Sequence, residues 1–303
     1  MDVACNATAL EDQAEINSTI YHLIKMIIMC VSCSLNTILS VPLLLVIPRS
    51  PSLLKHTRFL LLVHLLFCYN LQQLIWMIKA VLLGSRESLS LTQCLIFNAV
   101  NQAFSLVDLF LSTVLAVDRV IAIKWPLHYE FFICTKRKRA TVAAIWTLSV
   151  VLSSVGLCIS LTTIQTRFSL QRCRASVSTP CLSALVLYYT VTTALVLPLC
   201  YLIILGCFCL LCWDMHAGPF STNRAYVTLT LQAVQTILFS IPVLTNSYLI
   251  PSYLHNDALD IATSITYNLG VSLIPLVYGY RSRELQQRIR QAAHMNKVNS
   301  QNE

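Results

Sequence analysis

The sequence has few charged residues and few glycines. Asp, Glu, Lys and Arg make up only 11% of the 303 residues, whereas 56% are hydrophobic and the mean hydropathy is +0.68. Because a soluble domain carries about 25% charged residues, this chain has too few charges to cover a surface that faces water. Its 6 glycines argue against a glycine-rich channel and against a barrel of strands and tight turns. Lipid is therefore the main solvent of the chain.

The apolar segments indicate helices that cross a membrane. They are too long and too continuous for the alternating strands of a membrane barrel, and each suffices for a helical span of about 20 residues. We therefore predict an all-α membrane protein, a seven-transmembrane helix bundle within residues 20–280. The predicted spans are approximately 20–47, 58–83, 91–123, 139–163, 183–212, 224–250 and 258–280.

Polar residues interrupt the weakest of these spans. They are Gln72, Gln73, Lys79, Gln232, Gln235 and Asn246. In a membrane helix such residues turn toward the bundle rather than toward lipid, so they predict faces on which the helices meet.

The basic residues are distributed unequally between the two sides of the predicted membrane. If residues 1–19 form an extracellular tail, the inner loops and the C-terminal tail hold 15 of the 21 Lys and Arg residues. This is the asymmetry expected of cytoplasmic loops. The net charge of +8 then indicates a surface that faces anionic lipid rather than nucleic acid. We predict a multi-pass plasma-membrane protein with its N-terminus outside.

Two glycosylation acceptor motifs precede the first span and favour the same orientation. Asn6 begins Asn-Ala-Thr and Asn17 begins Asn-Ser-Thr. Residues 1–20 are polar and acidic and show no cleavable signal peptide, so we expect the first span to direct insertion itself.

Most of the 13 cysteines lie inside the predicted spans, where cysteine is a small apolar packing residue. This group comprises Cys30, Cys33, Cys68, Cys200, Cys207 and Cys209. The predicted outer side carries Cys5, Cys94, Cys173 and Cys181. We predict no metal site and no cofactor.

The stretch VDRVIAIKWPLHYE, residues 117–130, places Asp118 and Arg119 where the third span meets the cytoplasm. A charge at that depth costs about 3 kcal/mol, so pairing with the carboxylate is the favoured resting state of Arg119. The other interpretation is an ordinary interfacial arginine that extends to water.

Single residues along the chain match the landmarks of one family of membrane proteins. Cys94 begins the third span, and Asp118-Arg119-Val120 ends it at that family's interval. Further landmarks are Asn36, Pro126-Leu127, Trp146, Pro198, Pro242 and Pro275-Leu276-Val277-Tyr278. From about residue 20 to 294 the chain resembles the rhodopsin-like G-protein-coupled receptors.

Within that family, three stretches are similar to fish-type odorant receptors: DRVIAIKWPLHY, LVYGYRSRELQQ and RFLLLVHLLFCYN. The resemblance implies a receptor and not an enzyme, which senses a small odorant-like molecule and activates a heterotrimeric G protein. The alternatives are a rhodopsin-like receptor for a non-odorant ligand and a membrane transporter, for which we find no internal repeat.

The resemblance also implies roles for single residues. It assigns a G-protein switch to Asp118, Arg119 and Tyr278. It further implies a disulfide between Cys94 and the second outer loop, with Cys173 preferred over Cys181, which would fix that loop over the ligand pocket.

The chain departs from the family pattern in the middle of the bundle. The second span lacks the usual aspartate, and Tyr69 or Asn70 stands near its place, whereas the third span carries Asp108 about three turns from Arg119. We predict a polar core of Asn36, Asn70, Asp108 and Ser272. It is either sensitive to sodium or protons, or a protonated, hydrogen-bonded packing site. The sixth span reads Phe239-Ser240-Ile241-Pro242 without the usual tryptophan, and Ile274 replaces the seventh-span asparagine.

A polar face on the third span indicates where a ligand binds. Asn98, Asn101, Gln102 and Ser105 lie at i, i+3, i+4 and i+7 of one helical face. Residues predicted to complete the lining are Tyr188, Thr192, Asn246, Tyr248 and Tyr267. None is strongly charged, so nothing supports an amine ligand. The loop residues Arg167, Arg172 and Arg174 leave room for an anionic ligand or are simply solvated.

The C-terminal region, residues 281–303, is predicted to contain an amphipathic helix and a short polar tail. Leu285, Ile289 and Ala292 have helical spacing, and Arg283, Arg288 and Arg290 lie between them. Such a helix lies on the membrane surface and contacts lipid.

Overall fold

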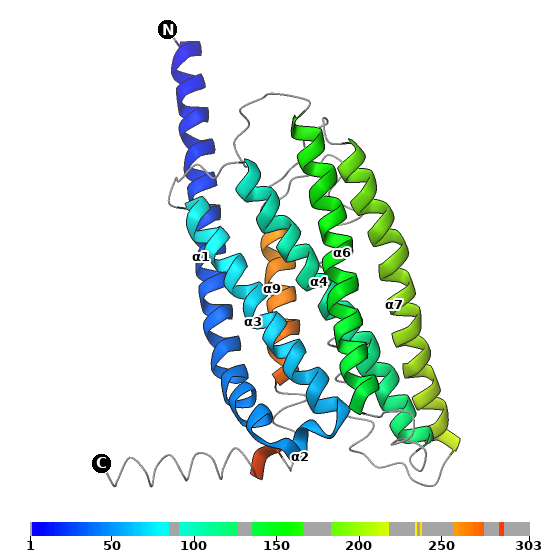
Figure 1. The fold of residues 1–303 in the computed structure, drawn as a ribbon. Helices are drawn as coiled ribbons and strands as arrows, with labels where there is room; N and C mark the ends of the chain where they lie inside the picture. The colour runs from blue at the N-terminus through cyan, green and yellow to red at the C-terminus, as the bar shows by residue number, and fades with distance from the viewer. Residues whose placement is uncertain are drawn as a thin grey trace.

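The computed structural model describes residues 2–84, 91–125, 135–165, 183–217, 234, 237, 257–275 and 285–287, and all its elements are helices (Figure 1). They are α1 (Asp2–Arg49), α2 (Pro51–Leu54), α3 (Thr57–Gly84), α4 (Leu91–Lys124), α6 (Thr135–Gln165), α7 (Ser183–Ala217) and α9 (Asp257–Ile274). The all-α prediction is confirmed for these residues.

The helix bounds agree with most of the predicted spans. The second to fifth predicted spans coincide closely with α3, α4, α6 and α7, and α9 begins where the seventh was expected. The first differs, because α1 continues back to Asp2. The sixth predicted span, 224–250, lies outside the described residues apart from the helical Val234 and Ile237.

Four of the described helices contain segments long and apolar enough to cross a membrane. These segments are Leu23–Arg49, Thr57–Lys79, Lys136–Ile159 and Thr190–Trp213. They belong to α1, α3, α6 and α7. Helix α4, which carries Asp108 and several polar side chains, is not among the four.

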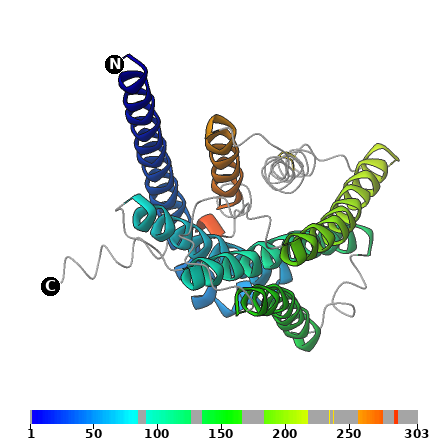
Figure 2. The same cartoon turned by 90° about the horizontal axis from the view of Figure 1, so that it is seen from above.

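Helix α4 has the central position among the described helices. It packs against α3, α6 and α7, while α1 packs against α3 and α9. Figure 2 shows α6 and α9 on opposite sides of α4. One face of α4 therefore meets α6, and another is turned toward the region between α3 and α9.

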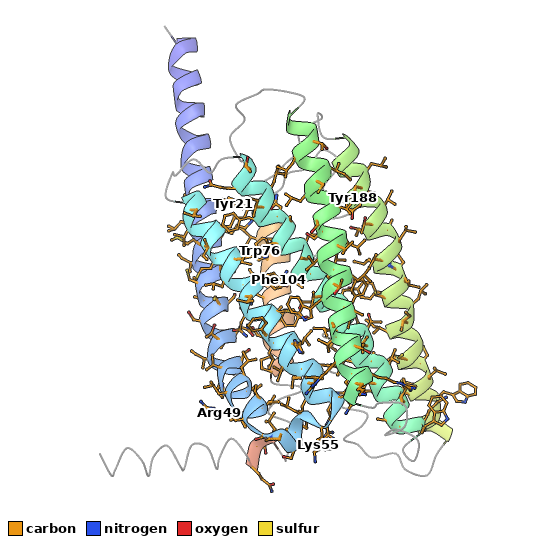
Figure 3. The ribbon with its side chains drawn as sticks, viewed as in Figure 1. Tyr21, Arg49, Lys55, Trp76, Phe104 and Tyr188 are labelled. Atoms are coloured by element: carbon orange, nitrogen blue, oxygen red, sulfur yellow. The ribbon has the colours of Figure 1, made fainter. Side chains whose placement is uncertain are left out.

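The buried apolar core gathers toward the end of the bundle that carries α2, which we call the α2 end. Its largest fully buried side chains include leucines of α3 and α4. Core members are Leu43, Ile47, Leu53, Leu61, Leu62, Leu65, Leu66, Leu111, Leu115 and Val142. In Figure 3, Arg49 and Lys55 mark the α2 end, and Trp76 lies toward the opposite end, which we call the far end.

Large apolar side chains also cover the outside of the bundle. Ile38 is 69% exposed, and Leu195 and Leu202 are each 67% exposed. Contact with lipid accounts for these surfaces, because hydrocarbon side chains need no burial in a hydrocarbon solvent. Pro42, Pro48 and Pro198 lie inside helices α1 and α7, as membrane helices tolerate.

The start of the predicted amphipathic helix is visible at the α2 end. Residues 285–287 are helical and lie beside α2, in red in Figure 1. Leu285 is fully buried in the same core cluster as Leu53, whereas Gln286 and Gln287 are exposed. Leu285 thus packs against the bundle itself, and the rest of the predicted amphipathic helix lies outside the described residues.

Candidate ligand site and cytoplasmic switch

Helices α3 and α4 are joined near the far end by three pairs of polar side chains, which we call the ladder. Lys79 Nζ donates to Asn98 Oδ1 at 2.9 Å, and Trp76 Nε1 donates to Asn101 Oδ1 at 2.6 Å. Gln72 Nε2 donates to Ser105 Oγ at 2.9 Å and to Asn101 Oδ1 at 3.3 Å. The ladder thus consists of Gln72, Trp76, Lys79, Asn98, Asn101 and Ser105.

The spacing of the ladder follows from helix geometry. From Lys79 the α3 members step back by three and four residues to Gln72, and from Asn98 the α4 members step forward by the same intervals to Ser105. Residues three and four apart share one face of a helix. Because the two helices run in opposite directions, equal steps keep the partners level.

The ladder also connects to α9. Tyr267 donates its hydroxyl proton to Gln72 Oε1 at 2.7 Å. At the next residue of α3 and of α9, Gln73 Nε2 donates to Asn268 Oδ1 at 3.2 Å. Hydrogen bonds between membrane helices hold them in register, so these contacts fix three helices relative to one another.

Most of the α4 residues predicted to bind ligand are brought together with Tyr267. Asn98, Asn101 and Ser105 belong to the ladder, and all three are half-buried. Gln102 and Thr192 are half-buried too, but no hydrogen bond within the described residues joins either of them to the ladder. Asn246 and Tyr248 lie outside the described residues.

Tyr188, which is predicted to complete the lining, is bonded to α6 and not to the ladder. Its hydroxyl donates to the carbonyl oxygen of Leu152 at 2.6 Å, so this contact ties α7 to α6. On the same side of α4, the Ser153 hydroxyl donates to the carbonyl of Ala99, and the rings of Phe104 and Trp146 meet edge to face at 6.0 Å.

Gln72, Trp76 and Lys79 were not predicted as site residues. Gln72 and Lys79 were noted only as interruptions of an apolar span. Their spacing with Trp76, i, i+4 and i+7, is the signal that could have found them, since it gives one polar face on α3. Together with the polar face of the following span, it indicates that the two faces meet, although not which residues pair.

The four residues of the predicted polar core do not form one hydrogen-bonded group within the described residues. Ser40 donates to Asn36 Oδ1 at 3.2 Å, and Ser272 donates to the carbonyl of Asn268 at 2.9 Å. Thr37 donates to Asn70 Oδ1 at 3.4 Å, so Asn70 faces α1. Asp108 is fully buried, and its two carboxylate oxygens have no hydrogen-bond partner there.

Tyr69, rather than Asn70, is the residue of α3 that approaches Asp108. Its side chain is 2% exposed, and it interacts electrostatically with Asp108, as do Cys68 and Tyr267. The register of α3, which the sequence left open, therefore sets a tyrosine beside the acid. Asp108 lies between the ladder and the leucine core.

The predicted switch lies at the α2 end of α4. Asp118 is buried, Arg119 is half-buried and Trp125 closes the helix with its backbone N–H donated to the carbonyl of Ile121. Beside them, Val120 packs with Leu211 of α7 in a small apolar cluster. Tyr278 lies outside the described residues.

Other predicted sites are described only in part. Cys94 lies in α4 and Asn6 and Asn17 lie in α1, but their side chains and all of Cys173 fall outside the described residues. The span cysteines Cys30, Cys33, Cys68, Cys200, Cys207 and Cys209 are free thiols.

Comparison with known families agrees with this arrangement of helices. The model of the 7 transmembrane receptor (rhodopsin family) matches residues 41–298. The chain belongs to the rhodopsin family of seven-transmembrane receptors. A separate comparison with curated proteins found no match.

Family membership fixes the general class of activity. This rhodopsin-family chain is a multi-pass membrane receptor, for which a ligand and a G protein are the general partners. Membership of this family points to a receptor rather than an enzyme. In such a receptor the ladder and the Asp118–Arg119 pair stand at opposite ends of one helix, α4.

Proposed function

We propose that this rhodopsin-family receptor senses a small odorant-like molecule at the far end and activates a heterotrimeric G protein at the α2 end. The far end then faces the outside of the cell and the α2 end faces the cytoplasm, with the receptor in the plasma membrane. The observation that carries this proposal is the ladder, because it gathers side chains of three helices at one end of the bundle.

Polar side chains at this depth favour a ligand site. Hydrogen-bonding groups inside a membrane bundle are costly unless they are paired, and they mark substrate and ligand pathways. A molecule that exchanges partners with the ladder changes how α3, α4 and α9 are held together. That change supplies the differential binding energy that activation requires.

The odorant assignment rests on the sequence. The stretches after Asp118 and around Tyr278 are similar to fish-type odorant receptors, and Ser240 and Ile241 precede Pro242 where most rhodopsin-like receptors have a tryptophan. Olfactory-type receptors share that absence.

We place the cytoplasmic response at Arg119. It is half-buried at the end of α4, next to the buried Asp118. When an arginine exchanges one bonding partner for another, the receptor changes between two discrete states, as activation requires. The basic residues Lys136–Arg139 begin α6 at the same end, and Lys138 donates to the carbonyl of Lys55.

A reporter assay in cells tests the proposal. Cells that express the receptor are exposed to an odorant panel that includes amino acids and bile-acid-like anions, and cyclic-nucleotide production is recorded. We expect at least one compound to raise the signal in receptor cells and not in cells that carry Arg119→Ala at equal surface density. A transporter would instead show substrate flux without a cyclic-nucleotide response. An antibody to an N-terminal tag should stain intact cells.

A further inference from the structure

The pairing of the ladder side chains determines which of their atoms donate hydrogen bonds and which accept them. A lysine ammonium and an indole N–H can only donate hydrogen bonds. The atoms of Asn98 and Asn101 that face Lys79 and Trp76 are therefore their amide oxygens, and this assignment does not depend on telling nitrogen from oxygen.

The same reasoning fixes Gln72. Since Asn101 presents its oxygen, the atom of Gln72 that approaches it must be the amide nitrogen, at 3.3 Å. The remaining oxygen of Gln72 then accepts the proton of Tyr267. The orientation of every amide in the ladder follows from the two donor-only residues at its far end.

A donor and acceptor count of the ladder gives an excess of donors. The oxygens of Asn98, Asn101 and Gln72 all accept hydrogen bonds from other ladder residues or from Tyr267. No hydrogen bond within the described residues uses the amide NH₂ groups of Asn98 and Asn101. Lys79 adds a positive charge, and whatever else it contacts, it can only donate.

The partial exposure of these donors makes them accessible to a small molecule. Asn98, Asn101 and Lys79 are half-buried rather than fully buried. Lys79 lies in the last part of α3 (Thr57–Gly84), toward the far end of the bundle, and Asn101 lies one turn further into the bundle than Asn98, the partner of Lys79. Trp76, which is bonded to Asn101, adds an aromatic ring to the same site.

We propose that the ladder receives the anionic end of the ligand, a carboxylate or an equivalent oxyanion, with Lys79 as its counter-charge and the amide NH₂ groups of Asn98 and Asn101 as further donors. This inference rests on the proposed function, since it names the ligand class of the same site. A protonated amine has only donors to offer, whereas every amide oxygen of the ladder already accepts a hydrogen bond and the charge of Lys79 repels a cation. A carboxylate offers about four acceptor sites.

The test compares acids with neutral molecules of the same skeleton. Straight-chain carboxylates from butanoate to decanoate and several amino acids are applied with the corresponding primary amides, alcohols and amines. Binding is measured as the shift of the thermal unfolding temperature of the purified receptor, and signalling is measured separately as cyclic-nucleotide production. We expect acids to shift unfolding and to signal at lower concentrations than their neutral counterparts.

Variants of Lys79 connect that preference to the ladder. Lys79→Met keeps the length of the side chain without its charge, and we expect about a tenfold or larger rise in the half-maximal concentration of the active acid. Lys79→Arg should largely restore the potency. The matched control is Lys25→Met, which removes another lysine that is bonded to Tyr21 on α1 and not to the ladder, and it should leave the potency unchanged.

Several outcomes overturn the inference. The inference is wrong if an amine or a neutral compound is active while the acid of the same skeleton is inactive. It is also wrong if Lys79→Met leaves the half-maximal concentration of the active acid unchanged. A panel in which no acid shifts the unfolding temperature has the same consequence. If Lys79→Met does not reach the surface, Lys79→Arg and the comparison of acids with amides in the parent receptor still decide. An acid that shifts unfolding but never signals contradicts the proposed function instead, and leaves the ligand class standing.

Discussion

The two ends of the α3–α4 pair are held together by different interactions. Toward the far end, three hydrogen-bonded pairs join the helices. Toward the α2 end, the contact consists of buried leucines such as Leu65, Leu66 and Leu111. Hydrogen bonds can be exchanged for bonds to a ligand, whereas packed side chains can change only by repacking. The far end is therefore suited to recognition and the α2 end to transmitting a discrete change.

Asp108 stands between these two regions and belongs to neither. It is fully buried, and its oxygens have no hydrogen-bond partner among the described residues, unlike the amide oxygens of the ladder about two to three turns away on α4. A buried acid of this kind is favoured in its neutral form unless it is paired. Within the described residues, the amide oxygens of the ladder are therefore hydrogen-bonded, whereas the carboxylate oxygens of Asp108 are not.

The largest effect is expected at the α2 end of α4. Arg119→Ala should abolish signalling or reduce it strongly, because it removes the residue best placed to change partner, while ligand binding at the far end stays largely intact. Asp118→Asn should raise basal activity, since it removes the neighbouring carboxylate and leaves the donor. Cyclic-nucleotide production at matched surface expression measures both. A surface-expressed Arg119→Ala receptor that signals like the parent would show that Arg119 is only an interfacial anchor.

A large loss of stability is expected when the leucine core is opened. Leu111→Ala, at a side chain that is 1% exposed, should lower the free energy of unfolding by about 2–5 kcal/mol, because it leaves a cavity. Thermal unfolding of the purified receptor measures the change. Leu195→Ala is the matched control, since Leu195 is 67% exposed to the lipid side and its loss leaves no cavity. Equal effects of the two substitutions would contradict the packing account.

A smaller loss is expected when the ladder is broken. Gln72→Leu removes bonds to Asn101, Ser105 and Tyr267. Hydrogen bonds between membrane helices contribute about 0.6 kcal/mol each on average, so the loss should be about 1–2 kcal/mol. Gln102→Leu on the same face of α4 serves as control in the unfolding measurement, because Gln102 makes no ladder bond. A control that loses as much as Gln72→Leu would show that the ladder bonds do not hold the helices.

The smallest effect is expected at Asp108. Asp108→Asn keeps the shape of the side chain and removes only its ability to ionise, so the unfolding free energy should stay within about 1 kcal/mol of the parent value if the acid is neutral. Unfolding is recorded in sodium and in N-methylglucamine buffers. A loss of stability that occurs only in sodium would mean that the acid holds a cation.

Much of this arrangement could be predicted from the sequence. Hydropathy placed α3, α6 and α7 closely, because each is apolar for the full width of a bilayer, and it also placed the bounds of α4 closely although that helix carries a polar face. The extension of α1 to Asp2 was missed, since polar and acidic residues carry no membrane signal. The α4 face of the ladder was predicted from its spacing.

The partners of that face could not be predicted from periodicity alone. Whether Lys79 lies level with Asn98 depends on the relative height of two antiparallel helices, which is set by packing between them. The same is true of the choice between Tyr69 and Asn70 as the neighbour of Asp108. The bond of the Tyr188 hydroxyl to the backbone of α6 likewise depends on how α6 and α7 pack, which periodicity does not give.

Nucleotide exchange on a purified heterotrimeric G protein tests the central claim most directly. The receptor is reconstituted in lipid nanodiscs, and exchange is recorded with and without the most potent compound of the odorant panel, for the parent and for Arg119→Ala. We predict that the compound accelerates exchange by the parent receptor, and that Arg119→Ala still binds the compound, seen as an unfolding shift, without accelerating exchange. A parent receptor that binds the compound and leaves the exchange rate unchanged would contradict the account.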